Sequence, residues 1–455
     1  MVEHRPFSIV CPSGCMASDE VLTFRLPLPH CLFSHRRWFE FMVTTAQEQD
    51  SLYPVVNAHN EWDPLEEIIV GVVEGALIPP WDVVMEATLH SEDLWDFYRQ
   101  HGGTPWPEEL IDAAKKDMNE FVHILEAEGV IVRRPTPYDF SKSYATPDFE
   151  IQSGCYALMP RDVLLVIGDQ IIEAPMGWRS RYHENHAYKD LCKGYFKEGA
   201  RWVSAPRPQL SDKTYKAGFV APKEGEPMRT ILTEFEPLFD AADVIKCGRD
   251  IFTAQSSCCN GFGIEWLQRH LGDEYRVHEV EVYDTHPMHI DATFYPLAPG
   301  KLLINPERVK KVPEMFEQAG WDILVCPEPL MPESHPMYNC SRWISMNVLM
   351  LDEERVIVSK GEDTLIKALK DWGFKPIACN FYDFETIAGG FHCASLDIRR
   401  RGELESYFSG TDSTTKGFAE PFGSRSKGEK DVLYLCCSWG GPPGHRCGVR
   451  HGPLG

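Results

Sequence analysis

Residues 163–173 read VLLVIGDQIIE, two short apolar runs separated by Gly168 and Asp169. A glycine and an acid between runs rich in Val and Ile are typical of a tight turn, so the stretch predicts a β-hairpin. The same pattern predicts three further hairpins, with strand pairs at Ala242–Lys246 and Asp250–Thr253, Thr293–Leu297 and Lys301–Asn305, and Asn347–Leu351 and Arg355–Ser359.

Helix-periodic stretches lie between these hairpins, and each ends at a glycine that leads at once into another strand. Pro107–Glu128 places its apolar residues on one face, stops before Gly129 and is followed by Val130–Val132. Three more stretches do the same, with helices over 264–271, 313–319 and 364–372, glycines at 272, 320 and 373, and strands over 276–282, 321–326 and 376–381.

A strand–hairpin–helix unit therefore recurs every 50–80 residues of the middle of the chain. This periodicity indicates an α/β protein and favours a repeat architecture that closes on itself. An α/β sandwich with several antiparallel strands fits the same pattern equally well.

The composition is that of a globular enzyme of 455 residues, with 45 Lys and Arg against 68 Asp and Glu and a formal net charge of −23. A surface with this excess of acids repels polyanions, so we expect no nucleic-acid partner. No apolar run approaches the roughly 20 residues that span a bilayer, so we expect no membrane span.

The two ends differ from the middle, and we expect residues 1–50 and 409–455 to be poorly ordered around a catalytic domain at 51–408. The start shows no secretory signal, and its acids, which include Glu3 and Asp19, are unusual for a mitochondrial presequence. The 15 cysteines form no C-x-x-C pair and indicate reduced thiols. These features favour the cytoplasm.

Motifs for nucleotides and metals are missing or incomplete. Gly261-Phe-Gly263 begins a dinucleotide fingerprint, but Trp266 stands where its third glycine belongs. The sequence has no G-x-x-x-x-G-K-[ST], H-E-x-x-H or G-x-S-x-G motif. We therefore predict no metal and no organic cofactor.

Three short segments suggest chemistry. Gly389-Gly390 leads towards Cys393, which we expect at the start of a strand, and two glycines are expected where a backbone passes close to another group. His289 and Asp291, in the segment 287–293, lie two apart and would share one side of a strand. Asp240 stands among apolar and small residues before a strand. The structural alternatives are a core cysteine, a surface ion pair and a helix N-cap.

Together these segments supply a thiol, an imidazole and carboxylates. Carboxylates bind a planar guanidinium through paired hydrogen bonds, and a thiolate is a strong side-chain nucleophile near neutral pH. A histidine can move the protons that such an attack requires. The set therefore fits nucleophilic attack by sulfur on a guanidinium carbon.

The sequence resembles the amidinotransferases, in particular those that use glycine, over residues 55–408. The resemblance runs through many ordered segments, among them Asn60–Glu67, Arg133–Pro135, Thr146–Glu150, Met159–Asp162, Ile171–Met176, Trp178–Arg181, Phe239–Asp243, Met288–Phe294, Ser345–Met350, Gly389–Cys393 and Asp397–Gly402.

The resemblance implies a five-bladed α/β propeller, pentein-like and with pseudo-fivefold symmetry, in a homodimer without metal or organic cofactor. It implies Cys393 as the nucleophile that carries a covalent amidino group, His289 as acid and base, and Asp240 as the group that orients His289. The implied substrate-binding residues are Asp148 and Asp291 for the guanidinium, and Arg308 and Ser341 for the α-carboxylate of L-arginine.

The loop with His286 and Met288 would border the acceptor amine, for which glycine is favoured, giving guanidinoacetate and ornithine. His286, Cys340 and Ala388 depart from the glycine-specific pattern of Asn, Ser and Gly. The alternatives are another amine such as an inosamine or a natural-product precursor, a hydrolase that releases citrulline, and a silent binding protein. The resemblance also implies a mitochondrial location as the alternative to the cytoplasm.

Overall fold

The computed structural model describes residues 54–89, 92–226, 228–332 and 334–408. The predicted terminal segments, 1–50 and 409–455, lie outside the described residues. None of the helices in the described ranges is long and apolar enough to cross a lipid bilayer.

The hairpin at 163–173 forms as expected, with strands β5 (Leu164–Ile167) and β6 (Gln170–Glu173) pairing antiparallel. Gly168, at the turn, has a φ of +60°, which suits a residue without a Cβ atom. Helix α6 (Lys189–Lys197) then leads to β7 (Arg201–Ser204), which pairs parallel to β6. The unit is therefore a hairpin, a helix and a third, parallel strand.

The same order of elements returns three times. In each unit a helix connects the second strand of a hairpin to a parallel third strand. The units are β8 (Val244–Cys247), β9 (Asp250–Thr253), α7 (Gly261–Leu271) and β10 (Arg276–Glu279); β11 (Phe294–Ala298), β12 (Lys301–Ile304), α8 (Glu314–Gln318) and β13 (Asp322–Val325); and β14 (Leu349–Met350), β15 (Arg355–Ser359), α9 (Asp363–Asp371) and β16 (Lys375–Cys379).

A fifth sheet joins the two ends of the described chain. Its central strand β1 (Leu65–Val70) pairs antiparallel with β17 (Ser395–Arg400) and parallel with β2 (Ile131–Arg133), which follows the long helix α4 (Glu108–Ala127). The described strands thus form five three-stranded sheets and one two-stranded sheet, and none of these sheets is closed. The remaining elements are α2 (Met85–Thr88), α3 (Glu92–His101), β3 (Tyr144–Ala145), β4 (Glu150–Ile151), α5 (Pro160–Val163) and α10 (Tyr382–Ile387).

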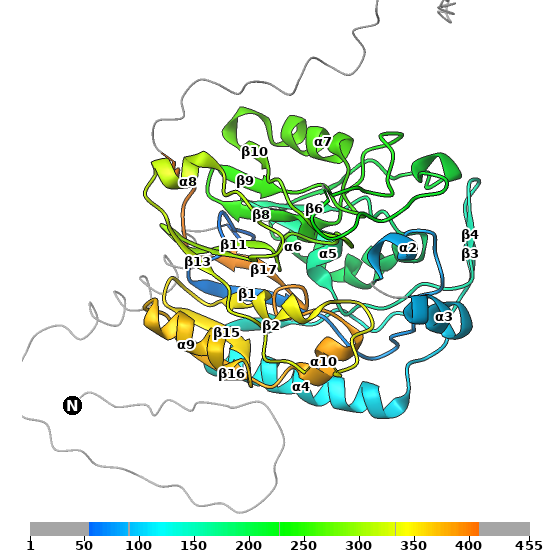
Figure 1. The fold of residues 1–455 in the computed structure, drawn as a ribbon, viewed down its shortest axis with the longest axis horizontal. Helices are drawn as coiled ribbons and strands as arrows, with labels where there is room; N and C mark the ends of the chain where they lie inside the picture. The colour runs from blue at the N-terminus through cyan, green and yellow to red at the C-terminus, as the bar shows by residue number, and fades with distance from the viewer. Residues whose placement is uncertain (1–53, 90–91, 227, 333, 409–455) are drawn as a thin grey trace, which may run out of the picture.

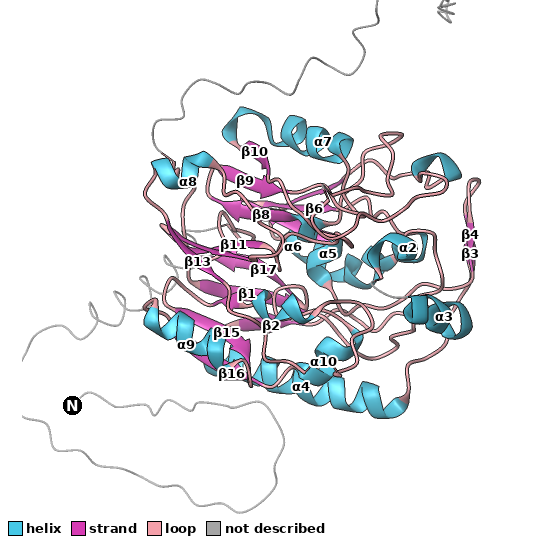
Figure 2. Ribbon diagram, in the orientation of Figure 1, coloured by secondary structure: helices cyan, strands magenta, loops and turns pink. Residues whose placement is uncertain are grey.

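Helices α4, α7 and α9 lie on the outer side of the strands (Figures 1 and 2). Helix α4 buries Met118, Phe121 and Leu125 on one face, as its periodicity predicts. Strands β5 and β6 are buried along their whole length, which explains their continuous apolar runs.

Two local predictions are wrong. Residues 287–293 form a loop before β11 and not a strand, and His289 has a φ of +62° in the left-handed region. Cys393 lies in a turn two residues before β17 and not at the start of the strand. Both segments nevertheless contribute to one pocket.

Candidate active site

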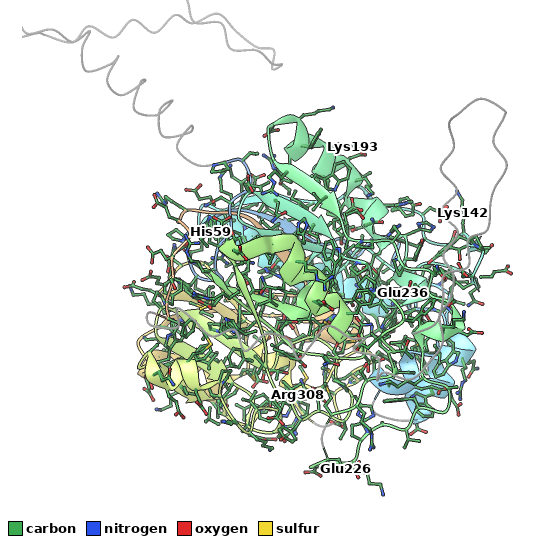
Figure 3. All side chains as sticks on the ribbon, turned by 90° about the horizontal axis from the view of Figure 1, so that it is seen from above. His59, Lys142, Lys193, Glu226, Glu236 and Arg308 are labelled. Carbon is green, nitrogen blue, oxygen red and sulfur yellow. The ribbon has the colours of Figure 1, made fainter. Side chains whose placement is uncertain are left out.

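A pocket of about 560 Å³ opens among the described residues. That volume lies within the range of roughly 300–1,000 Å³ typical of small-molecule sites. Loops from distant parts of the chain form its walls, and they contribute Asp162, Asp284, His286, Met288, His289, Asp291, Arg308, Ser341 and Cys393 among others. Arg308 and Glu226, another lining residue, lie on the same side of the molecule in Figure 3.

Cys393 reaches this pocket because two glycines precede it. A Cβ atom on Gly389 would lie 2.9 Å from the Cβ of Cys393, and one on Gly390 would lie 2.7 Å from the Cβ of Asn347. Asn347 holds the cysteine at two points, since its Nδ2 donates to Sγ (3.2 Å) and its Oδ1 accepts from the Cys393 amide (3.0 Å). The close backbone approach expected from the glycines is therefore confirmed.

The thiol of Cys393 lies against a carboxylate. Its Sγ donates to Oδ2 of Asp291 at 3.3 Å. Burial and the charge of Asp291 both raise the pKa of the thiol, so the resting sulfur is protonated. A cation that enters the pocket would favour the thiolate.

His289 lies between two carboxylates. Its Nε2 is 3.1 Å from Oδ2 of Asp240, and its Nδ1 is 3.8 Å from Oδ1 of Asp162. Burial alone would lower the pKa of the imidazole, but these acids outweigh it and hold the pKa of His289 well above its ordinary value. Its left-handed backbone costs about 1–3 kcal/mol, which is common at functional sites.

One of the two residues predicted to bind the guanidinium lies outside the pocket. Asp148 is exposed in the turn between β3 and β4, and it is not among the residues that line the pocket. Strands β3 and β4 lie at the edge of the molecule (Figure 1). Asp162 lines the pocket instead, at the end of α5, and its buried Oδ1 has no hydrogen-bond partner. Oxygen and nitrogen atoms of Asp162 and His289 and the Cys393 sulfur all lie within 4.8 Å of one another.

A second group of polar side chains surrounds Arg308. Its Nε pairs with Oδ2 of Asp284 at 2.9 Å, and its Nη2 donates to Oγ of Ser341 at 3.0 Å. The loop that carries Asp284 continues through His286 and Met288, which are half-buried and line the pocket. The amide of His286 donates to Oδ1 of Asp284 at 2.9 Å, so the predicted acceptor loop and Arg308 are directly connected.

A buried network of charged and polar side chains holds Asp291 in place. His392 lies between Oδ2 of Asp291 (2.8 Å from Nδ1) and Oε2 of Glu61 (3.2 Å from Nε2). Burial would raise the pKa of Asp291, but the hydrogen bond from His392 outweighs it and lowers the pKa. Glu61 pairs with the buried cations Arg161 and Lys246, and both of these cations also pair with Asp397.

Removing one cation from this network should destabilise the protein strongly. Arg161 pairs with Asp397 at 2.8 Å and with Glu61 at 3.5 Å, all three side chains being buried, so Arg161→Met leaves these carboxylates undercompensated. We expect the free energy of unfolding to fall by about 3–5 kcal/mol in chemical denaturation. The control Arg401→Met removes an exposed pair with Glu66 and should cost less than about 1 kcal/mol. Equal losses would contradict the structural role of the network.

The comparison with known proteins identifies the family. The chain is 55% identical over 352 residues to the L-arginine:L-lysine amidinotransferase of Pseudomonas savastanoi pv. phaseolicola. The aligned region covers 77% of this chain and 96% of that protein. The chain belongs to the amidinotransferase family. It is also 47% identical over 366 residues to the mitochondrial glycine amidinotransferase of Danio rerio, with 78% of this chain and 85% of the relative covered. A scan against protein-family models finds no match.

A solved amidinotransferase shares the fold of this amidinotransferase. The enzyme of the saxitoxin biosynthetic pathway of Microseira wollei is 53% identical, superposes with a TM-score of 0.75, and matches 78% of this chain and all of the solved one. The strong sequence match therefore extends to the tertiary structure.

Several residues that build the site of this amidinotransferase, in the pocket wall or behind it, escape a motif search. Asp162 follows directly on a proline and an arginine in the segment Met159–Asp162, and the only signal is an acid next to a buried apolar strand. Asn347 and His392 are ordinary polar residues in sequence and acquire a role through contacts with Cys393 and Asp291.

Among the described residues of this amidinotransferase, two trios of side chains could hold a metal ion. They are Asp162, His289 and Cys393, and Asp240, Cys258 and His289, with ligand atoms within 4.8 Å of one another in each. The first trio faces the pocket, where the same carboxylate is available to an organic cation. The arrangement thus combines a thiol, a histidine and two acids, Asp162 and Asp291, in one pocket.

Proposed function

We propose that this amidinotransferase takes the amidino group of L-arginine onto Cys393 and passes it to an amine. The observation that carries the proposal is the position of the Cys393 thiol beside two carboxylates, Asp162 and Asp291, in one pocket. Two carboxylates suit a guanidinium, whose flat array of N–H donors pairs with acids from two sides. The proposed catalytic domain spans 51–408.

The proposed reaction has two half-steps, and one proton is transferred through His289 in each of them. Sulfur bonds to the guanidinium carbon, the bond from that carbon to the side-chain nitrogen of arginine breaks, and the thiol proton is delivered through His289 to the departing ornithine amine. In the second half-step an amine bonds to the same carbon, loses a proton through His289, and Cys393 leaves as a thiol. Asp240 keeps the imidazole oriented through its bond to Nε2.

Arg308 and Ser341 are proposed to bind the α-carboxylate of arginine. They lie together on the pocket wall and present N–H and O–H donors. Met288 and His286 are proposed to border the amine that enters second, because their loop lines the same pocket.

Two acceptor classes are proposed, glycine and a longer diamino acid such as lysine. Glycine follows from the sequence resemblance and from the relative in Danio rerio. The relative from Pseudomonas, at 55% identity, is named for lysine, and the pocket of about 560 Å³ offers room for a longer chain.

We also propose that the five three-stranded sheets are the blades of a pentein-like propeller. The recurring hairpin–helix–strand unit and the pairing of β17 with β1 support this arrangement, because they join the last unit to the first.

The experiment that tests the proposed function follows mass and products in sequence. Arginine alone should release ornithine and leave an amidino adduct that peptide mapping places on Cys393. Glycine or lysine added to the isolated adduct should then remove it as guanidinoacetate or as homoarginine. Citrulline as the main product, or no adduct, would overturn the transferase proposal.

A further inference from the structure

Asp284 lies directly beside the residue proposed to bind the substrate carboxylate. Its Oδ2 is 2.9 Å from Nε of Arg308, and only 12% of its side chain and 15% of that of Arg308 are exposed. Pairing through Nε leaves Nη1 and Nη2 of Arg308 near Thr293 (3.4 Å) and Ser341 (3.0 Å). Each oxygen of Asp284 has room for a further hydrogen bond, since a carboxylate offers about four acceptor positions.

The α-ammonium and α-carboxylate of an amino acid share one carbon, so the groups that bind them must be neighbours. The acids that line the pocket among the described residues are Asp162, Glu224, Glu226, Asp284, Asp291 and Glu307. Asp162 and Asp291 lie at Cys393, at the other end of a bound arginine. Glu226 pairs with Arg229, and Glu307 accepts from the indole of Trp343 at 2.7 Å. Asp284 is the pocket acid in an ion pair with Arg308.

We propose that Asp284 binds the α-ammonium of the amino-acid substrate while Arg308 binds its α-carboxylate, and that the preferred acceptor is a linear diamino acid. This inference rests on the proposed function, because it assigns a substrate class to the same pocket. Asp284 is thus a specificity residue of both half-reactions.

The reversibility of the first half-step gives the reason for this acceptor class. Ornithine leaves the amidino-cysteine with its head group held by Arg308 and Asp284, so the reverse step is an attack by the side-chain amine of a diamino acid held in the same way. A second diamino acid of similar length can use both contacts. Glycine has one amine, which must attack the amidino carbon, so it cannot give that amine to Asp284.

The test compares acceptors on the isolated amidino-cysteine enzyme, in the full chain and in its Asp284→Asn variant. Asparagine keeps an oxygen that can accept from the His286 amide but removes the negative charge. For the original chain we expect kcat/KM for adduct discharge by L-lysine to exceed that for 6-aminohexanoate, which lacks the α-amine, by about 10- to 100-fold, the range of one charge-assisted contact. In the variant this ratio should fall to within about threefold of one.

Two controls separate recognition from structural support. Glu224→Gln neutralises an exposed acid on the pocket wall that has no contact with Arg308 and should keep the lysine preference. If Asp284 only positioned Arg308, Asp284→Asn would weaken lysine and 6-aminohexanoate equally, and the proposal would be wrong. Equal use of the two acceptors by the original chain would also overturn it. Failure of arginine to form the adduct would instead refute the transferase proposal, before any acceptor is added.

Discussion

Replacing Cys393 by alanine is expected to abolish both the amidino adduct and the release of ornithine. The sulfur is the atom to which the amidino carbon bonds, so no other contact in the pocket can replace it. By analogy with other enzymes that lose a member of a catalytic unit, we expect kcat to fall by about 10⁴-fold or more. The measurement is ornithine release under saturating arginine, with intact-mass analysis of the same sample.

The control for this prediction is another buried cysteine. Cys192 on α6 is 1% exposed and does not line the pocket, so Cys192→Ala should leave adduct formation and turnover within a few-fold of the original. Thermal unfolding of both variants separates a lost nucleophile from a lost fold. Ornithine release by Cys393→Ala at the original rate would rule out the covalent route.

The second large effect should come from Asp162 and not from Asp148. Asp162→Asn removes the charge of a buried carboxylate that lines the pocket and whose Oδ1 accepts no hydrogen bond, so the arginine guanidinium would lose one of its two anions. Losing one partner of a buried charge pair typically costs about 3–5 kcal/mol, which corresponds to a loss of roughly 10²- to 10³-fold in kcat/KM for adduct formation.

Asp148→Asn is the matched change at the position that the sequence resemblance implied. Because Asp148 is exposed in the turn between β3 and β4, we expect kcat/KM for arginine to stay within about threefold of the original. Single-turnover adduct formation, followed by mass at several arginine concentrations, measures both variants. A large loss in Asp148→Asn with little change in Asp162→Asn would restore the original assignment.

Local sequence patterns predict most of the helices and strands because their causes are local. The runs around Gly168 and the helix before Gly129 follow from periodicity and turn chemistry, and both form close to the predicted bounds. The strand predicted at 287–293 fails for an equally local reason: Pro287 cannot donate its nitrogen and His289 adopts a left-handed backbone, so the segment forms a loop. The alternating polar residues of this segment, His289 and Asp291, line the pocket and do not belong to a sheet.

The candidate nucleophile and its histidine were accessible from sequence through ordered motifs and the double glycine before Cys393. The sequence did not show which of Asp148 and Asp162 lies in the pocket. Both residues lie in segments that match the family, and only burial distinguishes them. Asp284 has no signal in sequence apart from its place in the acceptor loop. Its contact with Arg308 joins residues 24 positions apart in the chain through the packing of two loops.

By itself, the sequence determined the α/β units and the family, and it indicated candidate residues for the chemistry, because these depend on neighbours along the chain. The tertiary structure alone decided which acids face the thiol and how they are held. His392 contacts Asp291 across 101 residues and Glu61 across 331. Such contacts depend on how five sheets and their loops pack together, and spacing along one sequence carries no information about which loops meet.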